Sequence, residues 1–176
     1  MRVRTGIVLS LVITAAVVGP RGLRAADAGP VIEVRHAPRQ DGQDWAIAET
    51  ANFRIYHNES RKVAERAVRI AEAARAAAAK KWFGEDLPAW DAPCDIYLYA
   101  TAEDYSWATH QPPQVAGHSS FDFKDGRVAW RRIDLHCDDP NAFVGVLPHE
   151  TAHAVLAGRI VGRRLPHWAD DAPGQH

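Results

Sequence analysis

Residues 146–157 read Val-Leu-Pro-His-Glu-Thr-Ala-His-Ala-Val-Leu-Ala, and this stretch decides how the rest of the chain is interpreted. If it is helical, His149 and His153 lie one turn apart on the same face. Both imidazoles could then bind one Zn²⁺ ion at about 2.0–2.1 Å. Glu150 follows the first histidine directly, where it could act on a metal-bound water instead of binding the metal. The other residues of the stretch are uncharged, as expected of a helix that crosses a core, and a core helix that merely carries two histidines is the alternative.

The first 26 residues have the layout of a secretory signal peptide. Arg2 and Arg4 give a positive start, an apolar run occupies residues 6–18, and small residues surround Ala26. The run is short for a membrane span, which needs about 20 residues, although an uncleaved N-terminal anchor is an alternative. We therefore expect export to the periplasm or the exterior, with no stable membrane association after cleavage near Ala26.

The length of 176 residues fits one domain. We divide the chain into a signal peptide (1–26), a loose N-terminal segment (27–44) and one domain (45–176). Residues 1–26 hold four arginines and no acid, so the remainder has 21 − 4 = 17 basic and 22 acidic residues, a net charge of −5. An acidic balance without a basic patch argues against a nucleic-acid partner.

The sequence contains two cysteines, Cys94 and Cys137, and each stands beside a predicted strand. In an oxidising compartment they would form a disulfide if those two strands are neighbours. Two unpaired thiols are the alternative.

Hydrophobic patterning and turn signals predict an α+β domain. The predicted strands cover residues 45–57, 95–100, 119–123 and 127–136, and the predicted helices cover 60–83, 101–110 and 140–157. Asp125-Gly126 predicts a hairpin. Pro148 predicts a kink in the last helix or a later start, and Gly158 predicts its end. The six tryptophans and the alanine-rich helix suit packing, and we assign them no chemistry.

Local signals also predict the ends and the buried face of the helix 60–83. Asn58 or Ser60 can cap its start, and Gly84 suits its end. Its charged residues, Arg75 among them, are expected to lie mostly away from one apolar stripe. That stripe consists of Val63, Ala67, Ile70, Ala71, Ala74, Ala78 and Trp82. Thr101 and Asp104 form a capping box at the start of the helix 101–110.

A catalytic zinc site generally takes three protein ligands and leaves the fourth position to water. Two histidines are therefore an incomplete site. The candidates for the third ligand follow the predicted helix and are His167, Asp170, Asp171 and His176.

The segments 147–153 (Leu-Pro-His-Glu-Thr-Ala-His) and 165–171 (Leu-Pro-His-Trp-Ala-Asp-Asp) resemble the zincin metallopeptidases. The closest resemblance is to gluzincin-like exported proteins of the peptidase MA-like type. In that family a Pro-x-Trp-x-x-Glu-Gly segment follows the active-site helix, and its Glu is the third zinc ligand. Pro166 and Trp168 match that segment, and Asp171 stands where Glu is expected.

The resemblance implies a zincin-like fold, in which a mixed β-sheet packs against the long helix and the active-site helix. It also implies a zinc-dependent peptidase that hydrolyses a peptide or protein substrate. His149, His153 and Asp171 would bind Zn²⁺, and Glu150 would be the catalytic base. Asp170 becomes the third ligand if the register differs by one residue.

In this family an antiparallel edge strand lines the substrate cleft. We expect the hairpin strand 127–136 to hold an extended peptide by strand addition, with Trp130, Arg131 and Arg132 near the substrate. An exposed edge strand whose charges prevent aggregation is the alternative.

The chain departs from the family after Asp171, where only residues 172–176 follow. In the family the second helix continues and supplies further substrate contacts. We therefore expect a C-terminally short member or a truncated product. The alternatives are a catalytically inactive zincin-fold protein that binds a peptide without cutting it, and an exported domain that binds no metal.

Overall fold

The computed structural model describes residues 8–9, 32–38 and 45–160. Its strands are β1 (Val8–Leu9), β2 (Arg35–Ala37), β3 (Ala46–Glu49), β4 (Phe53–His57), β5 (Cys94–Tyr99), β6 (Gly117–Lys124) and β7 (Arg127–His136). Its helices are α1 (Arg61–Phe83), α2 (Ala102–Thr109) and α3 (Leu147–Ile160), and the π-helical turns η1 (Ala142–Val146) lead into α3. Among the described residues, no helix is long and apolar enough to cross a membrane.

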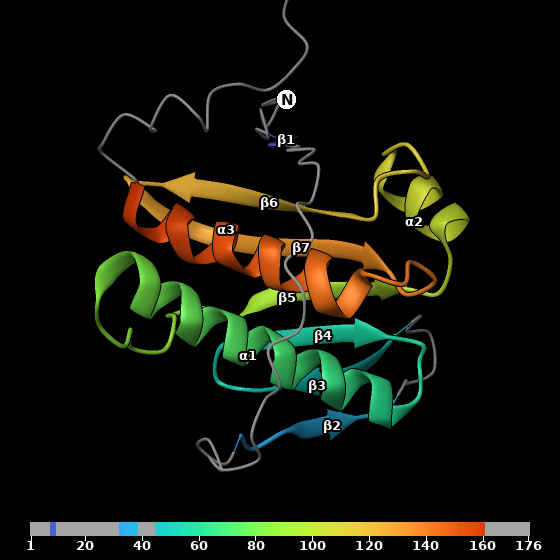
Figure 1. The fold of residues 1–176 in the computed structure, drawn as a ribbon, viewed down its shortest axis with the longest axis horizontal. Helices are drawn as coiled ribbons and strands as arrows, with labels where there is room; N and C mark the ends of the chain where they lie inside the picture. Colours follow the sequence, from blue (N-terminus) through green and yellow to red (C-terminus); the bar gives the residue numbers. More distant parts are fainter. Residues whose placement is uncertain (1–7, 10–31, 39–44, 161–176) are drawn as a thin grey trace, which may run out of the picture.

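The strands form one mixed sheet in the order β1-β6-β7-β5-β4-β3-β2. The pairs β4–β5 and β5–β7 are parallel, and the other pairs are antiparallel. Helices α1 and α3 lie side by side on one face of this sheet, and α2 lies at the end where β5 and β7 finish (Figure 1). The α+β class with a mixed sheet, predicted from the sequence, is confirmed.

Local signals fix the ends of α1 as the sequence predicts. The Ser60 side chain accepts a hydrogen bond from the Val63 N–H, and Gly84 ends the helix in the left-handed conformation with φ 73°. The buried face is rotated relative to the predicted apolar stripe. Arg75 is buried, although we expected it to face solvent, and Trp82 is 48% exposed, although we expected it in the stripe.

The core lies between the sheet and the two helices. Side chains from alternate positions of three central strands face α1 and α3. These core residues are Phe53, Ile55, Ile96, Leu98, Ile133 and Leu135 from the strands and Ala64, Ala67, Val68, Ala71, Leu147 and Ala154 from the helices. Many of the helix residues are alanines, which allows α1 to lie close to the sheet.

The single strand predicted over residues 45–57 is wrong, because the structure forms two strands there. A tight turn separates β3 from β4, closed by a hydrogen bond from the Thr50 N–H to the Phe53 carbonyl at 2.8 Å. Glu72 on α1 then accepts hydrogen bonds from the Thr50 hydroxyl at 2.8 Å and the Asn52 amide at 2.9 Å. The polar turn is therefore anchored to the long helix, a contact that no local pattern reveals.

The hairpin β6–β7 forms where it was predicted. Asp125 and Gly126 both have positive φ, 52° and 72°, as a two-residue hairpin turn requires. However, β7 lies inside the sheet between β6 and β5, so the prediction that it is a free edge strand is wrong. On that side of the sheet β6 is the last long strand. Its outer side pairs only with the two residues of β1.

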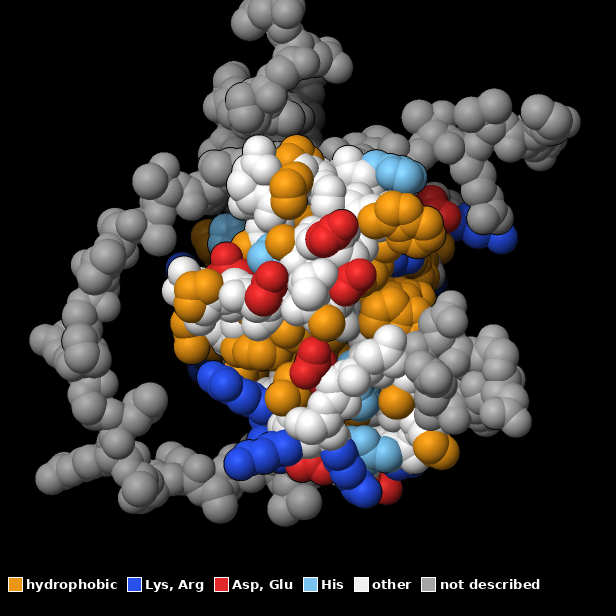
Figure 2. Space-filling model, turned by 90° about the vertical axis from the view of Figure 1, so that its right-hand side faces the viewer, with side chains coloured by type: hydrophobic (Ala, Val, Ile, Leu, Met, Phe, Trp, Pro, Cys, Tyr) orange, Lys and Arg blue, Asp and Glu red, His pale blue; other side chains and the backbone are white. Residues whose placement is uncertain are grey.

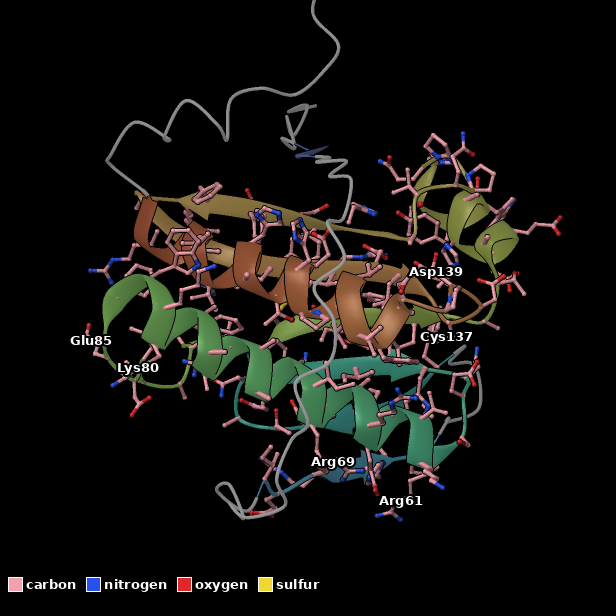
Figure 3. The ribbon with its side chains drawn as sticks, viewed as in Figure 1. Arg61, Arg69, Lys80, Glu85, Cys137 and Asp139 are labelled. Atoms are coloured by element: carbon pink, nitrogen blue, oxygen red, sulfur yellow. The ribbon has the colours of Figure 1, made fainter. Side chains whose placement is uncertain are left out.

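The predicted disulfide is absent, and Cys94 and Cys137 are free. Their strands are neighbours, but β5 and β7 run parallel, so the start of one strand and the end of the other lie at opposite ends of the sheet. The Cys137 N–H donates to the Tyr99 carbonyl, five residues along β5 from Cys94. At about 3.3 Å per residue this places the cysteines about 16 Å apart, whereas a disulfide needs Cα atoms within about 7 Å. Figure 3 labels Cys137 at the α2 end of the sheet.

The last helix begins later than residue 140, as one reading of Pro148 predicts. Pro148 lies in the first turn of α3, where a missing N–H costs little. The predicted end at Gly158 is wrong, because α3 continues to Ile160. A Cβ atom at position 158 would lie 3.0 Å from the Arg131 guanidinium, so glycine leaves room for that side chain.

Candidate metal centre

The two histidines of α3 point their distal ring nitrogens at the same place. The distance between His149 Nε2 and His153 Nε2 is 3.0 Å, so without a metal one ring donates a hydrogen bond to the other, and the ring planes are nearly perpendicular at 85°. Both side chains are partly buried. The helix that carries them contacts β6, β7 and α1. The four-residue spacing therefore brings together two imidazoles that can share one ligand.

These two nitrogens fit a zinc ion closely. Two nitrogens bound to one tetrahedral zinc at about 2.0–2.1 Å lie about 3.3–3.4 Å apart. The observed separation of 3.0 Å is within about 0.4 Å of that distance, which a small rotation of either ring would supply. Both rings also favour the neutral state that a metal requires. Burial lowers the pKa of His149, and burial together with the nearby His149 lowers the pKa of His153 to about 4.

Glu150 is buried between the helix and the sheet, with 6% of its surface exposed. Its Oε2 accepts a hydrogen bond from the Ser119 hydroxyl of β6 at 2.7 Å. Burial raises the pKa of Glu150 to about 7, because a carboxylate is poorly solvated there, while the bonds from Ser119 act in the opposite direction. A carboxyl group with a pKa near 7 can both take up and release a proton at neutral pH.

Ser119 was not identified from the sequence as a site residue. It belongs to a strand that was predicted, and its side chain is buried, but nothing in the local pattern links it to α3. The link arises because β6 lies beneath α3, which depends on the strand order.

The edge of the sheet beside this site can receive another strand. In the antiparallel pairing of β1 with β6, Leu9 stands opposite Ser119 and Val8 opposite Ser120. The partner of Glu150 is therefore also a residue at which an extended chain adds to the sheet. An extended peptide bound in the same way would run past the face of α3 that carries the histidines.

The third ligand cannot be placed, since Asp171, Asp170, His167 and His176 lie outside the described residues. The predicted signal peptide also lies there, apart from the two residues of β1. Within 8–9, 32–38 and 45–160, no group of three or more His, Cys, Asp or Glu side chains could hold a metal. The described part of the chain therefore contains His149 and His153, which were expected to be two of the three ligands, and Glu150, which was expected to be the base.

Comparisons of this chain with protein-family models, with curated proteins and with solved structures found no match.

Proposed function

We propose that this chain is a zinc-dependent peptidase that acts outside the cytoplasm. One observation carries the proposal, namely that His149 and His153 direct their Nε2 atoms to one point while the intervening Glu150 is buried with a raised pKa. Structural histidines on a core helix do not need to converge, and a structural glutamate is rarely buried without a cationic partner. The mixed sheet beneath α1 and α3 is compatible with a zincin-like fold, which we include in the proposal.

His149 and His153 would hold the metal as neutral imidazoles, with Asp171 as the third ligand. When bound there, Zn²⁺ would polarise the scissile carbonyl and make a water molecule more acidic. If Asp171 is not the ligand, Asp170 and His167 remain the candidates. All three follow α3 in the sequence, so any of them would bind the metal only if the chain turns back toward the two histidines after the helix.

Glu150 would serve as the general base. Its carboxylate would accept a proton from the attacking water and pass it to the leaving amine. Ser119 would fix the orientation of this carboxylate by holding Oε2 at 2.7 Å. Since the hydrogen bond comes from a sheet strand instead of a loop, it would position the base firmly.

The substrate would be an extended peptide bound antiparallel along β6, in place of the strand 127–136 that the sequence suggested. The pairing of β1 with Ser119 and Ser120 supports this arrangement, because it presents the same backbone edge. Residues 8–9 fall within the predicted signal peptide, so cleavage near Ala26 would free this edge.

The proposal is tested by following peptide cleavage in the zinc-loaded chain with mass spectrometry, using a denatured protein as a broad substrate. Glu150→Gln should lower the cleavage rate by at least about 10²-fold while zinc remains bound. His153→Ala should lose both zinc and cleavage. His110→Asn is the matched control, because His110 is an exposed helix cap with φ 59° that asparagine also tolerates.

Two results would change the assignment. Cleavage that survives Glu150→Gln would contradict the role of this residue as the base. Zinc binding in the wild-type chain without cleavage of any peptide would favour the alternative, a catalytically inactive zincin-fold binding protein. That alternative draws its support from the sequence, in which Asp171 stands where the family has Glu.

A further inference from the structure

A cavity lies at the end of the sheet where β5 finishes, between the sheet and α2. Its volume is about 420 Å³, within the range of small-molecule sites. It contains none of the residues of the candidate metal centre. Its lining includes Trp45, Tyr99, Glu103, Asp104 and Trp107.

The sheet side of the cavity is aromatic. Trp45 precedes β3 and meets the rings of Tyr97 and Tyr99 edge to face, with centroids 5.6 and 5.4 Å away. Tyr97 in turn stacks on Tyr56 at 4.5 Å, so Trp45 belongs to a continuous cluster of aromatic rings. These contacts hold the Trp45 ring firmly as a wall of the cavity.

The opposite side of the cavity is formed by α2. Glu103 and Trp107 are four residues apart, and Asp104 lies next to them, so the three project from one side of this helix. Trp107 is 83% exposed, the highest value among the exposed large hydrophobic side chains of the described residues. No ring pair or cation–π contact within the described residues involves it. Because Trp107 lines the same cavity as Trp45, it adds apolar surface that a ligand in the cavity would cover.

The cavity is also acidic. Glu103 and Asp104 line it, and no lysine or arginine does. Figure 2 views this end of the molecule and shows acidic side chains among hydrophobic ones, while most Lys and Arg side chains in view gather below them. Two N–H groups at the start of α2 already have acceptors within the chain and offer no competing anion site. The Asp104 N–H is taken by the Thr101 hydroxyl, and the Ala102 N–H by Asp138.

We propose that this cavity binds an organic cation, with the ammonium group between the Trp45 and Trp107 rings and beside the Glu103 and Asp104 carboxylates. Aromatic faces attract alkylated ammonium groups through the ring quadrupole, and Trp is the strongest of the three aromatic residues in this role. The carboxylates add charge complementarity and exclude anionic ligands. A neutral sugar could also stack on tryptophan, but it would gain nothing from two carboxylates that lack a cationic partner in the wall.

The proposal is tested with choline as the probe, against its neutral isostere 3,3-dimethylbutan-1-ol. The signals of the tryptophan side-chain N–H groups are followed by ¹⁵N NMR in the full chain, and the Trp107 signal is identified as the one that Trp107→Ala removes. Choline should shift the Trp107 signal and one other tryptophan signal in a saturable manner. The neutral isostere should bind at least about fivefold more weakly.

Two variants and a matched control complete the test. Trp107→Ala and Glu103→Gln should each weaken choline binding about two- to fivefold, as measured on the remaining shifted signal. Trp82→Ala should leave the binding unchanged, since Trp82 is another exposed tryptophan but lies on α1 and does not line the cavity. Both α2 side chains are exposed, so these variants should retain the fold.

Three results would overturn the proposal. Equal binding of choline and its neutral isostere would show that the cavity recognises only apolar volume. Saturable binding of glucose in place of choline would assign the site to neutral sugars. A linear, unsaturable response to choline would show that no site exists.

Discussion

The hydrogen bond from Ser119 to Glu150 should be worth far more to stability than an ordinary serine contact. Ser119→Ala leaves a buried carboxylate oxygen without its 2.7 Å donor, and only 6% of the Glu150 surface is exposed, so water cannot replace the serine. Hydrogen bonds to charged groups contribute about 1.5–3 kcal/mol. At about 2–4 °C of Tm per kcal/mol for a chain of this size, Tm should fall by about 3–12 °C.

Urea unfolding followed by circular dichroism measures this effect. We would work at pH 8, above the Glu150 pKa of about 7, and with a chelator present, so that the carboxylate is ionised and no metal contributes. Ser120→Ala is the control, because it is the next residue of β6 and points to the opposite face. It should change the free energy of unfolding by less than about 0.5 kcal/mol.

A double-mutant cycle shows whether the effect belongs to this pair. In a Glu150→Ala background Ser119→Ala should cost less than about 0.5 kcal/mol, since the carboxylate is gone, which gives a coupling energy of at least about 1 kcal/mol. An equal cost of Ser119→Ala in both backgrounds would refute the reasoning, because the serine would then stabilise the fold through something other than Glu150.

Three further outcomes are expected. Gly117→Ala should lower the free energy of unfolding by about 1–3 kcal/mol, because the new Cβ would lie 2.7–2.9 Å from a valine methyl group and from atoms of β7. The control is Gly145→Ala, where the nearest atom to the new Cβ is 3.7 Å away. It should cost far less in the same urea experiment. Burial lowers the pKa of His118 below its ordinary 6.5, so the unfolded chain binds the proton more tightly. The free energy of unfolding should therefore be at its full value above pH 6.5 and should fall as the pH drops below 6.5. The fall should be smaller in His118→Gln. Alkylation of the unfolded, unreduced chain should label both Cys94 and Cys137, as measured by mass spectrometry. A single species that is not alkylated and is two mass units lighter would show that the two cysteines form a disulfide.

The parts of the fold that depend on neighbouring residues were predictable from the sequence. Ser60 and Gly84 cap α1, Asp125-Gly126 turns the hairpin, and Thr101 caps α2, each through contacts within a few residues. The same holds for the candidate site on α3. The approach of two imidazoles follows from a four-residue spacing on one helix, so it needs no knowledge of the rest of the chain.

The parts that depend on strand order and direction were not predictable. Arg127–His136 was expected at an edge, but β5 pairs with it in parallel and places it inside the sheet. The same parallel pairing separates Cys94 from Cys137. Arg75 was placed in solvent because arginine seldom lies in a core, but its guanidinium lies 4.9 Å from the Trp90 ring centroid and donates to the Leu87 carbonyl. Each of these contacts joins segments whose meeting no local pattern encodes.

The most direct test of the central claim is a crystal structure of the zinc-loaded chain, with data collected on both sides of the zinc absorption edge. We expect one anomalous peak about 2.0–2.1 Å from both His149 Nε2 and His153 Nε2, with an oxygen of Asp171 completing the protein ligands. A zinc ion bound elsewhere, or a site in which the two imidazoles bind no common metal, would contradict the account.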